Sequence, residues 1–228
     1  MTTARPRREP WYVAAKSLCL PPVKLWFRWR FEDLRRIPAS GAAIVACNHL
    51  SYLDPFSNAY AVIKAGRRPR FLAKEELFHV FLAGRALAGA HQIPVTRGTG
   101  DLTPLLRARD ALVVGECVVI YPEGTVTKRP DHLPMEGKTG VVRLSLMSGV
   151  PIIPMASWGS QAVWQKSGRG SLKYGRPVWT KVGEPIDLSA RAGEIDDRDA
   201  LREMTAQVIA GLTELAEDLR ARYPSEWT

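Results

Sequence analysis

A histidine and an aspartate five residues apart, His49 and Asp54, have the clearest capacity for chemistry in this sequence. A carboxylate bonded to one imidazole nitrogen fixes the tautomer of the ring, so the other nitrogen can remove a proton from a hydroxyl group. Such a base typically accelerates a reaction by about 10²–10⁴-fold. Asp54 could instead be only a helix N-cap, and His49 an ordinary loop residue. The pair alone leaves both interpretations open.

Two other uses of this segment are disfavoured. Ser51 or Ser57 could be the nucleophile of a hydrolase, but the Gly-x-Ser-x-Gly turn typical of such enzymes does not surround Ser51. A zinc site would need further ligands, and the other histidines lack the spacing of metal ligands. The three cysteines, Cys19, Cys47 and Cys117, are widely separated. Their spacing predicts neither a disulfide framework nor a metal cluster, and it indicates a reducing compartment.

Three later segments could complete a site. Residues 93–98 read as a strand ending at Arg97, whose guanidinium matches phosphate oxygens, although a solvated surface arginine is the simpler alternative. Residues 121–129 read as a strand followed by a Glu-Gly-Thr turn. There glycine allows close backbone approach and the hydroxyls and cations can bind an anion, unless this is only a polar turn with Glu123 exposed. Residues 149–154 would form a buried wall.

The elements that must position these residues follow from an alternation of apolar runs and helix-like stretches after Gly41. This alternation predicts one α/β domain over residues 37–228, with a mostly parallel central sheet flanked by helices. Each of the four segments lies at the end of a predicted strand or just beyond it, the edge where such sheets bind ligands. The predicted strands are residues 42–47, 70–73, 92–95, 117–121, 151–156 and 178–182, and the predicted helices are residues 54–65, 75–88, 101–114, 137–147 and a last helix with apolar residues from Leu201 to Leu219 at steps of three and four.

The first 40 residues differ from the rest in charge and aromatic content. They hold nine basic and three acidic residues, a net charge of +6 out of +9 for the chain, and six aromatic residues. Residues 10–20 and 22–36 are predicted to form two short helices separated by a Pro-Pro pair. Their composition is typical of a helix in a membrane interface, although a helix packed on the core with a solvated basic face is the alternative. We therefore expect residues 1–36 to hold the protein, as a peripheral or monotopic protein, on the cytoplasmic face of the cell membrane.

Together, the four segments resemble the motifs of the PlsC-like glycerolipid acyltransferases, a family that includes the 1-acylglycerol-3-phosphate acyltransferases. The resemblance covers about residues 40–190, and the form Glu-Gly-Thr-Val-Thr is similar to an actinobacterial branch. The usual arginine after Glu-Gly-Thr is Val126 here. The matching residues are Asn48, His49 and Asp54 of the first motif, Arg97 of the second, residues 122–125 of the third and residues 150–154 of the fourth.

The resemblance implies direct transfer of a fatty acyl group from acyl-CoA or acyl carrier protein to a free hydroxyl of a lysophosphatidic acid-type acceptor, as in phospholipid synthesis. His49 would be the general base and Asp54 would orient it. Neither a metal nor an organic cofactor is implied. We expect one of the cations after Val126 to replace the missing arginine. The expected substrate-binding residues are Asn48, Ser51, Arg97, Glu123, Gly124, Thr125, Thr127, Lys128 and Lys138.

Two alternatives change the partner of the protein. The same chemistry could act on glycerol 3-phosphate or on another lysophospholipid, because an anion site would serve all of these acceptors. A non-enzymatic basic module that binds nucleic acid or an anionic membrane is compatible with the charge. The sequence contains no recognisable nucleic-acid motif, so nucleic acid is not an expected partner.

Overall fold

The computed structural model describes residues 10–96, 98, 100–165 and 167–227 of the chain. Its centre is a seven-stranded sheet with the strand order β1-β7-β6-β2-β5-β3-β4. Strand β7 runs antiparallel to β6, and the other neighbouring pairs are parallel. The prediction of a mostly parallel sheet is confirmed. The strands are β1 (Arg28–Glu32), β2 (Ala43–Cys47), β3 (Pro69–Lys74), β4 (Ile93–Val95), β5 (Cys117–Ile120), β6 (Ile152–Trp158) and β7 (Pro177–Val182).

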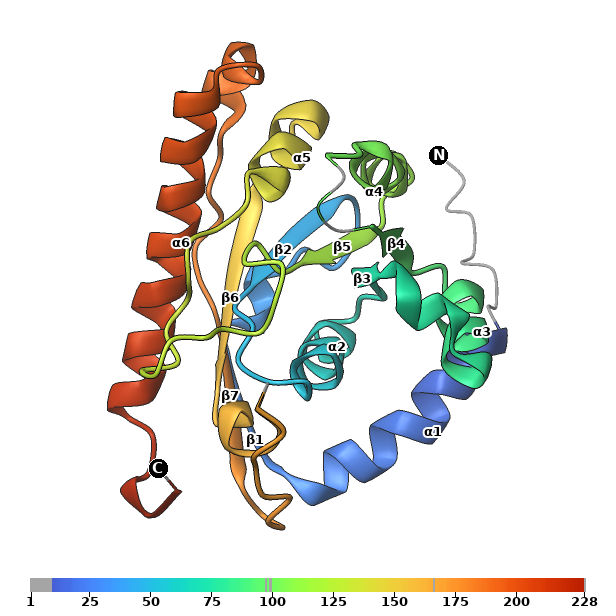
Figure 1. Ribbon diagram of the computed structural model, residues 1–228, viewed down its shortest axis with the longest axis vertical. Coiled ribbons are helices and arrows are strands. Elements are labelled where there is room, and N and C mark those ends of the chain that lie inside the picture. The colour runs from blue at the N-terminus through green and yellow to red at the C-terminus, as the bar shows by residue number, and fades with distance from the viewer. Residues whose placement is uncertain (1–9, 97, 99, 166, 228) are drawn as a thin grey trace.

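Helices cover both faces of the sheet (Figure 1). Helices α4, α5 and α6 pack against one face, and α2 packs against the other, with α1 outside α2 and beside α3. Among the described residues no helix combines the length and the apolar character needed to cross a bilayer. The helices are α1 (Pro10–Trp26), α2 (Asp54–Lys64), α3 (Phe81–Gly89), α4 (Thr103–Val113), α5 (Gly140–Ser148) and α6 (Arg198–Ala221).

Strand β2 shows why these elements assemble in this way. All five of its side chains are buried, and successive side chains point to opposite faces. Ile44 and Ala46 join the core under α4, α5 and α6, whereas Val45 and Cys47 join the core under α2. A strand buried on both faces needs a continuous apolar run, and the sequence supplies one here. The strand thus delivers the residues that follow Cys47 to the carboxyl edge of the sheet.

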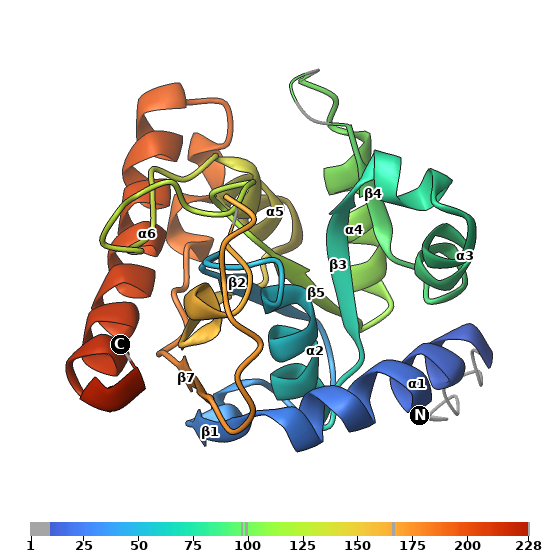
Figure 2. The same cartoon turned by 60° about the horizontal axis from the view of Figure 1, so that its bottom comes forward.

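The prediction of two helices over residues 10–20 and 22–36 is wrong. Helix α1 is one continuous helix that includes Pro21 and Pro22, and β1 is the edge strand beside β7. Aromatic and basic residues alternate one by one from Phe27 to Phe31, which is the period of a strand. Figure 2 shows β1 directly after the end of α1, at the lower edge of the sheet.

The predicted helix over residues 75–88 is interrupted as well. A 3-10 helix covers Glu75–His79, and α3 begins after Val80, whose backbone is extended. Gly84 lies so close to the first piece that a β-carbon on it would be 1.9 Å from the carbonyl oxygen of Phe78. The other predicted strands and helices agree with the structure, with small shifts at their ends.

Candidate active site

His49 and Asp54 are in direct contact at the carboxyl end of β2. His49 Nδ1 lies 2.9 Å from Asp54 Oδ2, and the Asp54 side chain is fully buried. An ionised carboxylate can only accept a hydrogen bond, so Nδ1 donates and Nε2 is left as the basic atom of the ring. The first residue of α2 is Asp54, and the hydrogen bonds of its side chain join His49, the loop before the helix and Ser160. The arrangement is that of a general base with its orienting carboxylate.

The carboxylate of Asp54 is also held by the loop before it and by a distant turn. Oδ2 accepts hydrogen bonds from the backbone N–H groups of Leu50, at 2.5 Å, and Ser51, at 2.8 Å. Oδ1 accepts a hydrogen bond from Ser160 Oγ at 2.6 Å. A buried charge is tolerated only when hydrogen bonds compensate its lost hydration, and these donors provide that compensation. Sequence reasoning missed Ser160, although it follows the end of a predicted strand.

Glu123 fixes the backbone of the same loop. Its Oε1 accepts a hydrogen bond from the backbone N–H of His49, and its Oε2 accepts one from Met135, both at 2.9 Å. Only 4% of Glu123 is exposed. Burial raises the pKa of Glu123 to about 7, against the opposing effect of the two backbone donors and of His49. Glu123 therefore clamps two loops together and is not an exposed residue of a polar turn.

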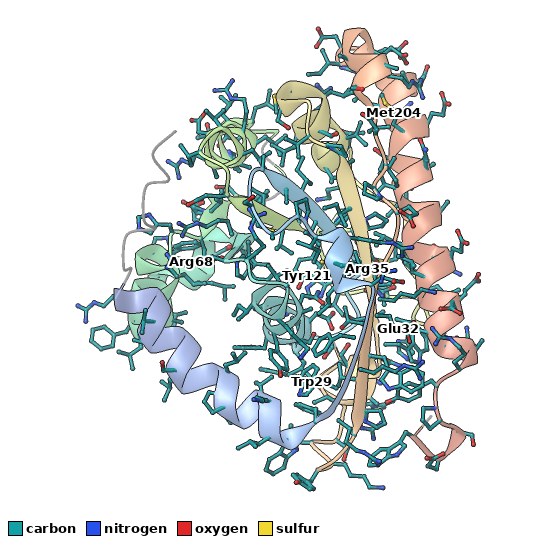
Figure 3. All side chains as sticks on the ribbon, turned by 180° about the vertical axis from the view of Figure 1, so that it is seen from behind. Trp29, Glu32, Arg35, Arg68, Tyr121 and Met204 are labelled. Atoms are coloured by element: carbon teal, nitrogen blue, oxygen red, sulfur yellow. The ribbon has the colours of Figure 1, made fainter. Side chains whose placement is uncertain are left out.

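Tyr121 supports the imidazole from the side, and sequence reasoning gave it no role. The rings of His49 and Tyr121 stack with their centres 4.2 Å apart and their planes 23° apart. The Tyr121 hydroxyl accepts a hydrogen bond from Asn58 Nδ2 in α2 at 3.1 Å, and Figure 3 shows Tyr121 beside this helix. Burial raises the pKa of Tyr121 well above its usual value. The aromatic residue before Pro-Glu-Gly-Thr was the available signal.

A cavity of about 610 Å³ opens beside the histidine. It lies at the carboxyl ends of β3, β4 and β5 and at the start of α5, as expected for an α/β sheet. Its volume is typical of a site for a small molecule. Apolar side chains such as Leu72 and Leu105 line it together with the cations Lys74, Lys138 and Arg143. Sequence reasoning singled out Lys138 but neither of the other two cations.

The predicted anion-binding turn is only partly in this cavity. Gly124 and Lys138 line it, and Gly124 has a φ of +66° that favours glycine. A β-carbon on Gly124 would lie 3.4 Å from Lys138 Nζ, so the two residues are adjacent. The structure does not place Thr125 or Lys128 among the lining residues, and Lys128 is exposed to solvent. Val126 is only 3% exposed, and it points into the protein.

Thr127 contributes to the loop and not to the cavity wall. Its backbone N–H donates to the carbonyl of His49 at 2.7 Å, and its hydroxyl donates to the carbonyl of Leu133 at 2.9 Å. Arg129, the next candidate cation after Lys128, forms an ion pair with Asp131 at 2.6 Å. Of the three cations Lys128, Arg129 and Lys138, the structure thus places Lys138 in the cavity beside the histidine.

Asn48 and Ser51 also hold the loop and do not line the cavity. The side-chain amide of Asn48 donates to the carbonyl of Ser157 at 3.1 Å and accepts from its N–H at 2.8 Å. Ser51 Oγ donates to the carbonyl of Trp164 at 2.8 Å. Both serines and Asn48 are fully buried. Arg97 lies outside the described residues, and its neighbours Thr96 and Gly98 line the cavity.

Comparison with known proteins gives consistent results. A protein-family model described as Acyltransferase matches residues 28–158. A 1-acyl-sn-glycerol-3-phosphate acyltransferase of Bacillus subtilis is 26% identical over 80% of this chain and 85% of that protein. A chloroplastic 1-acyl-sn-glycerol-3-phosphate acyltransferase of Arabidopsis thaliana is 25% identical over 79% of this chain, which spans about half of that longer protein (49%).

A solved structure shares the fold. The crystal structure of the 1-acyl-sn-glycerophosphate (LPA) acyltransferase PlsC from Thermotoga maritima superimposes with a TM-score of 0.69. The match covers 98% of this chain and 86% of that one, at 23% sequence identity.

Proposed function

Because this chain belongs to the Acyltransferase family, we propose that it is a 1-acylglycerol-3-phosphate acyltransferase of phospholipid synthesis. It would move a fatty acyl group from acyl-CoA or acyl carrier protein to the free hydroxyl of lysophosphatidic acid. The observation that carries the proposal is the His49–Asp54 pair beside a cavity that also contains Lys138. The names of the Bacillus and Arabidopsis relatives support the choice of acceptor. The Glu-Gly-Thr-Val-Thr segment supports an actinobacterial-type branch.

The reaction follows from the geometry of the pair. His49 Nε2 removes the proton from the acceptor hydroxyl while the hydroxyl oxygen attacks the carbonyl carbon of the thioester. Asp54 stabilises the imidazolium that forms. The tetrahedral intermediate collapses with cleavage of the carbon–sulfur bond. The thiolate leaves with the proton returned by His49, so the products are an ester and a free thiol. No covalent bond to the protein is required.

The acceptor phosphate would bind at the cationic side of the cavity. Lys138 is the proposed replacement for the family arginine, because it lies against Gly124 in the cavity and Val126 is buried. Arg97 is the second proposed phosphate ligand, on the resemblance alone. We assign Asn48, Ser51, Glu123 and Thr127 to the support of the site, and we assign no phosphate contact to Lys128. Thr125 stays a proposed acceptor contact on the resemblance alone.

An assay of thiol release tests this function directly. The purified enzyme is incubated with acyl-CoA or acylated carrier protein and with lysophosphatidic acid, glycerol 3-phosphate or lysophosphatidylcholine, and the acyl position in the product is mapped. We expect release that depends on lysophosphatidic acid and formation of phosphatidic acid. Preference for glycerol 3-phosphate would change the acceptor, and release with none of the acceptors would overturn the proposal.

We also propose that α1 lies on an anionic membrane surface, at the cytoplasmic face. Leu18 and Leu25 of α1 are 77% and 72% exposed, and Phe81 and Leu82 of the adjacent α3 are 69% and 68% exposed. Large exposed apolar side chains that gather on two adjacent helices typically mark an interaction surface. Replacing Leu18 and Leu25 with glutamate should reduce sedimentation with anionic liposomes. The matched control is glutamate at Val113 and Val114, which are 78% and 74% exposed at the end of α4. Equal losses in both double variants would contradict the proposal.

A further inference from the structure

Ser160 lies at a place where a small hydroxyl can control the orienting carboxylate. It follows the carboxyl end of β6 and is fully buried, with Oγ 2.6 Å from Asp54 Oδ1. The other carboxylate oxygen, Oδ2, already accepts three hydrogen bonds, from His49 Nδ1 and from the backbone of Leu50 and Ser51. Within the part of the chain that the structure describes, Ser160 is the donor to Oδ1. We propose that Ser160 is a positioning residue for acyl transfer, which acts on His49 through Asp54.

The turn that carries Ser160 is fixed by packing outside the active site. Gly159 has a φ of +101°, and a β-carbon on it would lie 2.3 Å from the carbonyl oxygen of Pro177. The hydroxyl of Tyr223 donates to the same carbonyl at 2.7 Å. The backbone N–H of Gly159 donates to Gln161 Oε1 at 2.7 Å. Only glycine fits this turn, so the direction of the Ser160 side chain is set by β7 and the end of the chain.

The cost of losing this hydroxyl follows from the burial of Asp54. A buried charged oxygen without a donor is strongly disfavoured, so in Ser160→Ala the carboxylate would rotate or recruit water. Each of these responses loosens the bond that holds the His49 ring. Because a general base contributes about 10²–10⁴-fold, we expect the loss of its support to reduce kcat by about 10-fold. This inference rests on the proposed role of His49 as the base.

A second buried serine provides a matched control. Ser57 in α2 is also fully buried, and its hydroxyl donates to the backbone carbonyl of Asp54 at 3.1 Å. Ser57→Ala therefore removes the same atom and a hydrogen bond to the same residue, but it leaves the carboxylate untouched. Ser160→Thr keeps a hydroxyl on the same β-carbon. A merely structural role of Ser160 would make the two alanine variants alike.

The experiment measures kcat, KM, melting temperature and the pH profile of the wild type, Ser160→Ala, Ser160→Thr and Ser57→Ala. In Ser160→Ala we expect kcat to fall about 10-fold with KM unchanged. The pH profile of its kcat should also differ from that of the wild type, because the donor that is removed binds the carboxylate that orients the base. The other titratable groups that face the pair are Cys47 from β2 and Tyr121 and Glu123 after β5, and they are the same in all variants. Ser160→Thr should stay within a few-fold of the wild type, and Ser57→Ala should keep the wild-type kcat and profile.

A proton NMR measurement separates this inference from the proposed function. The proton between His49 Nδ1 and the Asp54 carboxylate should give a strongly deshielded signal, which a His49→Gln spectrum assigns. We expect this signal to shift or broaden in Ser160→Ala and to persist in Ser57→Ala, whichever acceptor the enzyme uses. Equal losses of kcat in the two alanine variants, or an unchanged signal in Ser160→Ala, would overturn the positioning role. Absence of transfer to lysophosphatidic acid in the wild type would instead overturn the proposed function.

Discussion

His49 and Lys138 line one cavity, but the protein holds them in opposite ways. The side with His49 is buried and held by hydrogen bonds, from imidazole Nδ1 to the carboxylate of Asp54 and from the backbone N–H to Glu123. On the other side Lys138 is exposed, lies against the bare backbone of Gly124 and has no ion-pair partner among the described residues. The proton-transfer side is thus preorganised before the substrate binds, whereas the cation on the other side is free to bind an anionic group of the substrate.

This difference assigns different kinetic roles to the two sides. Groups fixed in advance act on the transition state, so their loss lowers kcat. A solvated cation that contacts the acceptor equally before and during the reaction contributes uniform binding, so its loss raises KM. Substitutions on the two sides should therefore separate in a plot of kcat against KM.

The largest effect should follow from His49→Ala. The hydrogen bonds that shape the loop are made by the backbone N–H of His49 to Glu123 and by its carbonyl with Thr127, and alanine keeps both. We expect kcat to fall by about 10²–10⁴-fold because the base is lost, and the melting temperature shows whether the variant is still folded. The matched control is His79→Ala on the exposed end of a 3-10 helix, which should leave kcat unchanged. Near-normal turnover of the His49 variant would show that His49 is not the base, and the two sides of the cavity would no longer have different roles.

The buried side of the site was predictable from sequence only in part. His49, Asp54 and the strand before them could be predicted because local signals carry them: an apolar run, a loop and a helix start. The contact with Ser160 could not, because it joins residues 106 positions apart. It depends on β6 lying beside β2 in the sheet, and no local pattern specifies that order of strands.

The same limit applies to the fold and to the cationic side. The central strands have continuous apolar runs and were predicted, but β1 was missed because its alternating basic and aromatic residues were assigned to an amphipathic helix. Lys74 and Arg143 belong to β3 and α5, and only the packing of these elements brings them to the cavity of Lys138. A basic residue carries no sequence signal that distinguishes a cavity wall from a solvated surface.

A second test concerns Glu123 on the buried side. Its pKa is raised by burial from its usual 4.5 to about 7, so the folded protein binds this proton more tightly than the unfolded chain. The stability from this group is therefore complete below pH 4.5 and is lost as the pH rises through about 7. Glu123→Gln cannot titrate. We expect the stability of the wild type relative to this variant to fall by about 3 kcal/mol from pH 4.5 to pH 8.

Urea denaturation at a series of pH values measures this difference. The control is Glu136→Gln, an exposed carboxylate on the same loop, which should leave the pH dependence as in the wild type. If the stability of Glu123→Gln kept the full pH dependence of the wild type, titration of Glu123 would not be the source of that dependence.

The smallest effect should come from Lys138→Ala on the open side. A charged hydrogen bond in a solvated site is worth about 1–1.5 kcal/mol, so KM for the phosphorylated acceptor should rise about 5- to 10-fold while kcat changes little. KM for the acyl donor should not change if the contact is with the acceptor phosphate. Initial rates with lysophosphatidic acid over a range of concentrations measure both constants.

Lys128→Ala decides whether the position of the charge matters or only its presence. Lys128 is exposed ten residues before Lys138, and it does not line the cavity. Long-range attraction of an anionic acceptor would be weakened similarly by either substitution, and the loss would disappear at high salt. A direct contact predicts a rise in KM for Lys138→Ala alone, with partial recovery in Lys138→Arg. If Lys128→Ala gave the larger rise, the acceptor phosphate would bind outside the cavity, and His49 and Lys138 would no longer be two sides of one site.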